Sequence, residues 1–247
     1  MLNQMTMERL RLMKLRGMSR AFEEQTGNPA MQHLSFEERF GLIVDAEWIK
    51  RKNNHLNRLL KKATLKFPEA CIENVEYHSD RKLDKGLISE LSTCNYIRSK
   101  RNVIVMGAAG AGKTYIGCAL GNVACRSLMS TKYVRLPEIL TDLEIARGDG
   151  SYKRILNQYK KYDLLIFDEW LLSPLSITQA RDLLEIIEAR YTCSSTVFIS
   201  QYAPAGWHLN IGEGTIADAV LDRIVHNSYE IHIEGQISMR ERMSFKR

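Results

Sequence analysis

The first quarter of the chain repeats its apolar residues at the spacing of an α-helix. A first helix is predicted up to a break at Gly17, and a short second helix follows it. Ser35 and Glu38 have the spacing of a capping box, which predicts the start of a long third helix that continues to Pro68. The sequence therefore predicts an all-α N-terminal domain over residues 1–67, which we expect to bind DNA or a partner protein.

The pattern changes after residue 101, where short β-branched or aromatic runs alternate with stretches of helical length. Five strands are predicted, at 103–106, 132–136, 164–167, 196–200 and 229–233. Helices are expected near 113–128, 137–147, 151–161, 177–191 and 215–226. Such alternation is typical of a mostly parallel sheet covered on both faces. We predict an α/β domain over 102–247, joined to the helical domain by a connecting segment over 68–101 with one helix.

Composition limits the class of protein without identifying it. The 247 residues are 45% hydrophobic and 26% charged, which is ordinary for a globular protein. No apolar run approaches the roughly 18 residues that a membrane span requires. The five cysteines are scattered without a CxxC pair, which favours a reducing compartment over a disulfide framework or a zinc site. We expect a cytoplasmic location and no membrane partner.

Positive charge is concentrated in one segment of the chain. Residues 49–67 contain seven Lys or Arg and no acid, while the formal net charge of the whole chain is only +6. We expect contacts to DNA phosphates from this run and from a second cluster near residue 150, although a solvated helix face is the alternative. The residues concerned are Lys50, Arg51, Lys52, Arg58, Lys61 and Lys62 in the run, and Arg147, Lys153, Arg154, Lys160 and Lys161 in the cluster.

A glycine-rich turn joins the first predicted strand to the next helix. It satisfies the GxxxxGK[ST] pattern, in which glycines let backbone N–H groups approach phosphates at a helix N-terminus. Lys113 would contact the β- and γ-phosphates of ATP, and Thr114 would bind Mg²⁺. A glycine-rich turn without a ligand is the alternative. The predicted nucleotide-binding residues are Gly107, Ala108, Ala109, Gly110, Ala111, Gly112, Lys113, Thr114 and Tyr115.

Two adjacent acids end the strand predicted at 164–167. Asp168 can reach the metal ion together with Thr114, while Glu169 can orient and deprotonate a water for attack on the γ-phosphate. A plain acid pair at the start of a helix is the alternative. Because nucleotide kinases have no reason to activate water, the pair favours ATP hydrolysis, with ATP and Mg²⁺ as cofactors and with Lys113 and Glu169 as catalytic residues.

Three further polar residues are candidates for the same site. Ser200 and Gln201 end the strand predicted at 196–200, where they would act as a sensor of the γ-phosphate or position the water. Arg223 is a single cation on an otherwise apolar helix. It is either an arginine finger that completes the site of a neighbouring subunit or a local ion-pair partner of Asp222 or Asp218.

Several segments together resemble a known family. GAAGAGKT, LLIFDEW, VFISQYAPAGWH, ADAVLDRIVHNSYEI and GQISMRERM are similar to the IstB-like helper ATPases of bacterial insertion sequences, which are AAA+ proteins related to the DnaC-type helicase loaders. The resemblance covers essentially the whole chain. It implies an AAA+ P-loop ATPase that binds duplex DNA, forms homo-oligomers on it and acts with the transposase of the same element in target selection. A replicative helicase loader is the alternative, and a scaffold that uses ATP only as an assembly switch is another.

The resemblance also assigns roles to single residues. Lys113 and Thr114 correspond to Walker A, Asp168 and Glu169 to Walker B, and Arg223 to the arginine finger. Gln201 stands where the family pattern has Asn, and Arg240 lies where a second sensor could be. The sequence ends at Arg247, which leaves no room for the helical lid common in AAA+ proteins.

Overall fold

The chain was described from a computed structural model, which covers residues 2–212, 214–235 and 237–244. It separates into two compact units, Met1–Arg58 (unit 1) and Leu59–Arg247 (unit 2). The boundary falls inside one continuous helix, α3 (Phe36–Ala63), rather than near residue 67. The last turn of this helix therefore belongs to the same compact unit as the sheet.

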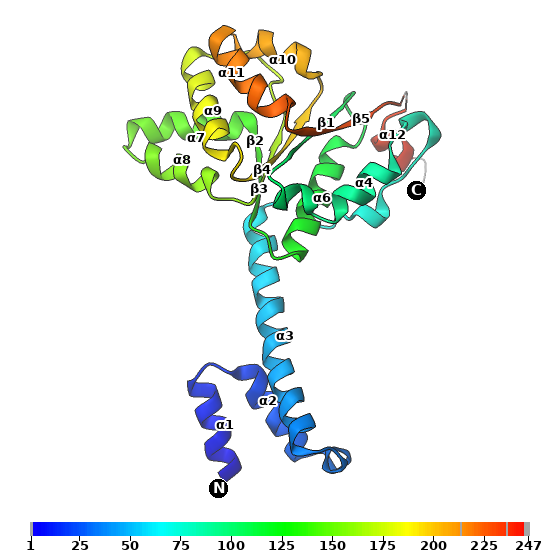
Figure 1. The fold of residues 1–247 in the computed structure, drawn as a ribbon, viewed down its shortest axis with the longest axis vertical. Helices are drawn as coiled ribbons and strands as arrows, with labels where there is room; N and C mark the ends of the chain where they lie inside the picture. Colours follow the sequence, from blue (N-terminus) through cyan, green and yellow to red (C-terminus); the bar gives the residue numbers. More distant parts are fainter. Residues whose placement is uncertain (1, 213, 236, 245–247) are drawn as a thin grey trace. The chain divides into compact units, whose positions relative to one another are not determined.

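Unit 1 consists of α1 (Leu2–Leu12), α2 (Arg16–Thr26), the 3-10 helix η1 (Pro29–His33) and the first part of α3 (Figure 1). The predicted capping box at the start of α3 is confirmed. The N–H of Glu38 donates to Oγ of Ser35 at 3.2 Å, and the N–H of Ser35 donates to Oε2 of Glu38 at 2.8 Å. Two donors that the helix itself cannot satisfy are thereby paired.

Gly17 does not break the helix, and the prediction of a break there was wrong. The chain turns at residues 13–15, where Lys14 has φ +60°, and Gly17 lies within α2. A Cβ atom at Gly17 would lie 2.7 Å from Cα of Glu47, so the glycine is needed for the close approach of α2 to α3.

Glu47 of α3 caps the beginning of α2. Its Oε2 accepts the N–H groups of Gly17 at 2.6 Å and of Met18 at 3.3 Å, and its Oε1 accepts Nε of Arg51 at 2.7 Å. Burial alone would raise the pKa of Glu47, but these hydrogen bonds outweigh it and lower the pKa below its ordinary value. The carboxylate thus joins the two helices in its charged form.

Unit 2 contains a five-stranded sheet in which every pairing is parallel. The strands are β1 (Asn102–Gly107), β2 (Thr131–Arg135), β3 (Leu164–Asp168), β4 (Ser195–Ser200) and β5 (Ser228–Ile233). Their order in the sheet is β2-β3-β4-β1-β5. The predicted α/β class and all five predicted strands are confirmed.

Helices alternate with these strands along the chain. Those that the sequence predicted are α4 (Lys85–Ser92), α6 (Lys113–Arg126), α7 (Leu136–Gly148), α8 (Tyr152–Lys160), α9 (Ile177–Arg190) and α11 (Gly214–Val225). The sequence did not predict α5 (Asn95–Arg98), α10 (Pro204–Ile211) or α12 (Met239–Ser244), or the 3-10 turns η2 (Ile72–Asn74) and η3 (Ser79–Arg81). Apart from α10, which has eight residues like the predicted α4, these elements have six residues or fewer and too few turns to show a helical period.

Strands β1, β3 and β4 are buried on both faces, as their continuous apolar runs require. Helix α6 packs directly on this sheet because it carries glycines where it crosses the strands. A Cβ atom at Gly117 would lie 2.5 Å from Cδ1 of Ile199, and one at Gly121 would lie 2.7 Å from Cδ1 of Ile166. The N-terminus of α6, with Lys113, is therefore held at the carboxyl end of β1.

Candidate nucleotide site

The glycine-rich turn between β1 and α6 is curled around Lys113. The ammonium group of Lys113 donates to the carbonyl oxygens of Gly107 and Ala108, both at 2.7 Å. Gly110 and Gly112 have φ of +79° and +92°, a region that glycine enters without strain. A loop of this shape at a helix N-terminus is suited to present backbone N–H groups to an anion. Burial lowers the pKa of Lys113, and Asp168 partly offsets that effect.

Two segments far away in the sequence hold this loop in place. Nη2 of Arg81 donates to the carbonyl of Ala111 at 2.9 Å, and the N–H of Met239 donates to the carbonyl of Gly110 at 2.9 Å. Arg81 is itself buried, and a Cβ atom at Gly110 would lie 2.7 Å from Cβ of Ser238. The sequence did not predict these two contacts, because the residues that make them lie 30 or more positions from the loop and no local pattern connects them to it.

Asp168 lies at the end of β3 beside Thr114, as the sequence suggested. Its Oδ2 accepts the hydroxyl of Thr114 at 3.0 Å and the hydroxyl of Tyr133 at 2.7 Å, while its Oδ1 accepts the N–H of Glu169 at 2.9 Å. Burial, together with the contact to Asp168, raises the pKa of Tyr133, so Tyr133 remains a donor. Tyr133 lies on β2 and was not predicted as a site residue.

The donor set fits a magnesium ion bound mainly through phosphate. A hydroxyl and one carboxylate are oxygen ligands of the kind that Mg²⁺ takes when substrate phosphates and water complete its shell. Among the described residues no group of three or more His, Cys, Asp or Glu could hold a metal ion alone. The phosphates would therefore have to supply further ligands at Thr114 and Asp168.

Glu169 is held by Arg135 at the end of β2. Nε and Nη2 of Arg135 donate to Oε1 and Oε2 of Glu169 at 3.0 and 2.7 Å, and Nη1 of Arg135 donates to Glu138 at 3.2 Å. This fork of hydrogen bonds raises the pKa of Arg135. Both carboxylate oxygens of Glu169 are thus engaged by Arg135 in this arrangement.

The two predicted sensor residues differ in their surroundings. The hydroxyl of Ser200 lies inside the fold, where it donates to the carbonyl of Trp170 and accepts Nε1 of Trp207, both at 3.1 Å. Gln201 follows β4 and is exposed. Arg240 is also exposed, on α12. Arg242 of the same helix forms an ion pair with Asp80. Of the residues predicted from β4, Gln201 is thus the one with a side chain on the surface.

Arg223 forms an ion pair within the chain, but with a residue that the sequence did not suggest. Its Nη2 donates to Glu188 at 2.8 Å and its Nη1 to the carbonyl of Ala219 at 2.7 Å. Asp218 and Asp222, the predicted partners, lie instead near His208 and His226. Glu188 stands on α9, 35 positions before Arg223, so its approach depends on the packing of α9 against α11.

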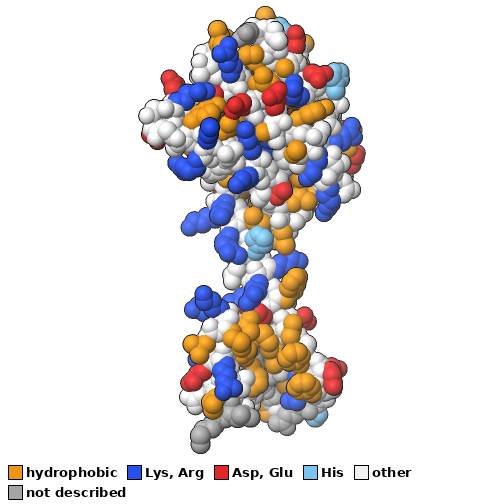
Figure 2. Space-filling view, turned by 60° about the vertical axis from the view of Figure 1, so that its left-hand side comes forward, with side chains coloured by type: hydrophobic (Ala, Val, Ile, Leu, Met, Phe, Trp, Pro, Cys, Tyr) orange, Lys and Arg blue, Asp and Glu red, His pale blue; other side chains and the backbone are white. Residues whose placement is uncertain are grey.

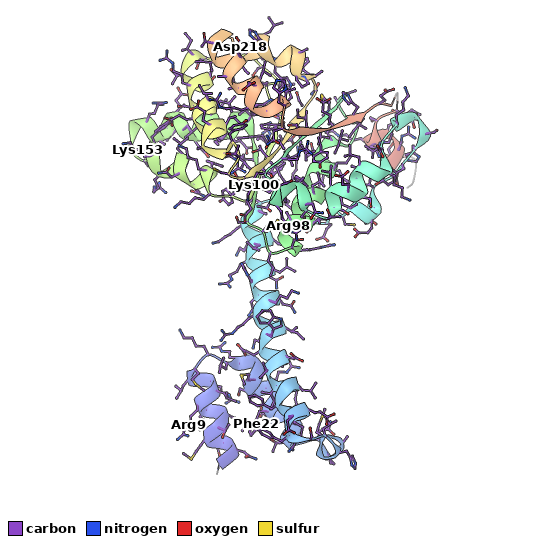
Figure 3. The ribbon with its side chains drawn as sticks, viewed as in Figure 1. Arg9, Phe22, Arg98, Lys100, Lys153 and Asp218 are labelled. Atoms are coloured by element: carbon purple, nitrogen blue, oxygen red, sulfur yellow. The ribbon has the colours of Figure 1, made fainter. Side chains whose placement is uncertain are left out.

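Arg223 is remote from the phosphate loop of its own chain. It lines a small hollow with Lys100, labelled in Figure 3, and with Asn102, which begins β1. The phosphate loop follows the last residue of the same strand. Six residues of parallel strand span roughly 17 to 20 Å. If Arg223 contacts a γ-phosphate, the phosphate must therefore belong to another copy of the chain.

The basic residues predicted on α3 are exposed. Arg51 among them forms an ion pair with Glu47. In the second cluster, Arg147 pairs with Asp182 and lies over the ring of Tyr152 at 4.2 Å. Lys153, in contrast, points outward from α8 in Figure 3.

Within the described part of the chain no helix is long and apolar enough to cross a membrane.

Comparison with known proteins gives a consistent result. Residues 8–247 match a family model described as IstB-like ATP binding protein. An insertion sequence ATP-binding protein of Sinorhizobium fredii is 40% identical over 96% of both chains. One of the insertion sequence IS1162 in Pseudomonas fluorescens is 44% identical over 81% of this chain and 87% of its own.

Solved structures show the same fold at lower identity. The crystal structure of DnaI aligns over 72% of this chain and 93% of its own, with a TM-score of 0.58 and 20% identity. That of the DnaC helicase loader covers 66% of this chain and 96% of its own, with a TM-score of 0.54 and 16% identity.

Proposed function

Since the chain belongs to the family of IstB-like ATP-binding proteins and has an AAA+ fold, we propose that it hydrolyses ATP as a helper of transposition. It would assemble on duplex DNA and act with the transposase of its own element in target selection. The relatives named for insertion sequences, matched over most of their length, support this over a replicative helicase loader. The likeness to DnaI and DnaC is below 25% identity and concerns the fold alone.

The observation that carries this proposal is the contact between the phosphate loop and the acid pair. Thr114 of the loop donates to Asp168 at 3.0 Å, and the next residue is Glu169. Thr114 and Asp168 would hold Mg²⁺, which supplies positive charge to the phosphate oxygens. Lys113 would exchange its two carbonyl acceptors for phosphate oxygens. A nucleotide and a base are thus brought to one edge of the sheet.

The hydrogen bonds between Arg135 and Glu169 suggest that hydrolysis is inhibited until these bonds break. Once free, the carboxylate would accept a proton from water while the water oxygen bonds to the γ-phosphorus and the bond to the ADP oxygen breaks. While both oxygens accept from Arg135, this proton transfer is disfavoured. We therefore propose that the described arrangement is a resting one.

We propose that a neighbouring copy of the chain supplies a further cation to the site. Charge develops on the phosphoryl oxygens during transfer, and an arginine that stabilises it is worth roughly 10³ to 10⁵ in rate. Arg223 fits this role in a neighbouring copy, because it lies at the opposite end of β1 from the loop and its side chain is partly exposed. Glu188 would hold it until assembly.

DNA binding would rest on the exposed basic residues of α3. Contacts of Lys and Arg to phosphates are weakly selective for sequence and fall steeply with salt. Lys61 and Lys62 stand in the last turn of α3, inside unit 2, while Lys50 and Lys52 stand in unit 1. Each unit by itself therefore carries basic residues proposed to contact phosphates.

The experiment is a measurement of ATP binding, ATP turnover and DNA binding in matched variants. Glu169→Gln should bind ATP like the parent and lose turnover by at least about 100-fold, while Lys113→Ala should bind ATP more weakly. Reversal of Lys61 and Lys62 to Glu should weaken duplex binding on all sequences alike and reduce its salt slope. Full turnover in Glu169→Gln would refute hydrolysis by this site, and unchanged DNA affinity in the reversal would remove α3 from the DNA surface.

A further inference from the structure

Arg135 lies between two acids, and only one of them belongs to the proposed site of hydrolysis. Nε and Nη2 of Arg135 donate to the two oxygens of Glu169, while Nη1 donates to Oε1 of Glu138 at 3.2 Å. Both acids raise the pKa of Arg135, and the hydrogen bonds to Glu169 are the larger cause. One guanidinium thus serves two carboxylates, so a shift of Arg135 towards Glu138 would withdraw hydrogen bonds from Glu169.

Glu138 is placed to accept the guanidinium of Arg135. It lies in the first turn of α7, three positions after Arg135, and has no other hydrogen bond or ion pair among the described residues. Negative charge is favoured at this end of a helix, where backbone N–H groups point outward. The side chains of Glu138 and Arg135 are 55% and 41% exposed, and acidic and basic side chains lie next to one another over unit 2 in Figure 2. Ion pairs at such exposed positions exchange at little cost.

The backbone around Glu169 is fixed, which leaves the side chain of Arg135 as the part that can move. The N–H of Glu169 donates to Oδ1 of Asp168 at 2.9 Å, and the N–H of the buried Trp170 donates to the carbonyl of Ile199 at 2.9 Å. Glu169 has φ +56°, a conformation that a residue other than glycine keeps only where its surroundings fix it. A rearrangement that frees the carboxylate is therefore expected to begin at Arg135.

A hollow of about 210 Å³ lies on another side of Glu169. Its lining comes from the start of α7, from residues 172–175 and from Glu169 itself, and includes neither Arg135 nor Glu138. A carboxylate at the wall of a hollow of this size can be hydrated. Moving Arg135 to Glu138 would therefore leave the hollow open for water beside Glu169.

We propose that Glu138 is a positioning residue for ATP hydrolysis, which takes the guanidinium of Arg135 away from Glu169 and so frees the catalytic carboxylate. This inference rests on the proposed hydrolysis at Glu169. In the described arrangement two of the three hydrogen bonds of Arg135 go to Glu169, and in the active arrangement they go to Glu138. The exchange moves hydrogen bonds and makes or breaks no covalent bond. Glu138 acts through Arg135 and needs no contact with the nucleotide.

The test is steady-state phosphate release by the full chain at saturating duplex DNA, with ATP varied so that kcat and KM are measured separately. Glu138→Gln should lower kcat roughly tenfold, the worth of one hydrogen bond between charged groups, and should change KM for ATP less than about twofold. Glu138→Asp keeps the charge and should restore part of kcat. Glu144→Gln is the matched control, since it makes the same charge change at an exposed position further along α7 and should keep the kcat of the parent.

The double variant shows whether Glu138 acts through Arg135. In the Arg135→Met background, Glu138→Gln should lower kcat no further, because no guanidinium is left to take. A kcat that Glu138→Gln leaves unchanged or raises, or lowers equally in both backgrounds, would overturn the inference. If Glu169→Gln abolishes turnover while Glu138→Gln has no effect, the inference alone fails. Full turnover in Glu169→Gln would overturn the proposed hydrolysis and this inference with it.

Discussion

The two units of this chain differ in whether the groups that could make new contacts are already paired within the chain. In unit 2 the groups that could do chemistry are already paired with the chain itself, Lys113 with loop carbonyls and Glu169 with Arg135. In unit 1 several large apolar side chains are exposed, Phe36 at 68% and Phe40 at 50% among them. Under the proposed function, unit 2 would have to release contacts before it acts, while unit 1 has apolar surface that a contact could cover.

Among variants of the contacts that unit 1 and unit 2 make within themselves, the largest change in turnover is expected when the contact between Arg135 and Glu169 is removed. Arg135→Met removes two charge-assisted hydrogen bonds and should raise ATP turnover without DNA by roughly tenfold or more. Steady-state phosphate release measures this effect. Arg135→Lys, which keeps the charge but loses the fork, should lie between parent and Arg135→Met. A drop in turnover with Arg135→Met would mean that Arg135 supports catalysis and does not restrain it.

A smaller effect should separate the stability of the two units. Glu47→Gln removes the charge that caps α2 and should destabilise unit 1 by about 1 to 3 kcal/mol without changing ATP affinity in unit 2. The folded pKa of Glu47 lies below its ordinary 4.5. Its stabilisation is therefore present above pH 4.5 and is lost as pH falls through the folded pKa. Urea unfolding of unit 1 at pH 7 and under acid should show that the variant lacks this part of the pH dependence.

The smallest effect should be at Tyr133, whose hydroxyl donates to Asp168. Tyr133→Phe removes one hydrogen bond of about 1 kcal/mol and keeps the ring, so ATP affinity in the presence of Mg²⁺ should weaken about fivefold. Without Mg²⁺ the two proteins should bind ATP alike. Titration with a fluorescent ATP analogue distinguishes these cases. Equal loss of affinity with and without Mg²⁺ would show that Tyr133 supports the fold of the loop and not the metal ligand.

Local sequence predicted the parts of the site that are close together along the chain. The phosphate loop, the acid pair and all five strands follow from runs of a few residues. Tyr133 and Arg135 were missed because their contacts to Asp168 and Glu169 depend on the register of β2 against β3, in which Arg135 lies opposite Asp168. A single sequence gives the strands but not this register.

Gly17 and Arg223 show the same limitation in another form. A glycine between two helical patterns suggested a break, whereas Gly17 serves the close approach of α2 to Glu47, 30 positions away. An arginine on an apolar helix suggested an acid nearby in sequence, whereas Arg223 reaches Glu188 on α9. In both cases the deciding neighbour is supplied by packing.

If a second copy of the chain completes hydrolysis at this site, mixing two inactive variants should show it most directly. Glu169→Gln and Arg223→Ala should each be nearly inactive. Mixed in equal amounts under conditions where the subunits co-assemble, they should recover about a quarter of the parent's turnover, because one half times one half of the interfaces pair an intact Glu169 with an intact Arg223. A mixture no more active than either variant would contradict the claim and leave Arg223 as the structural partner of Glu188.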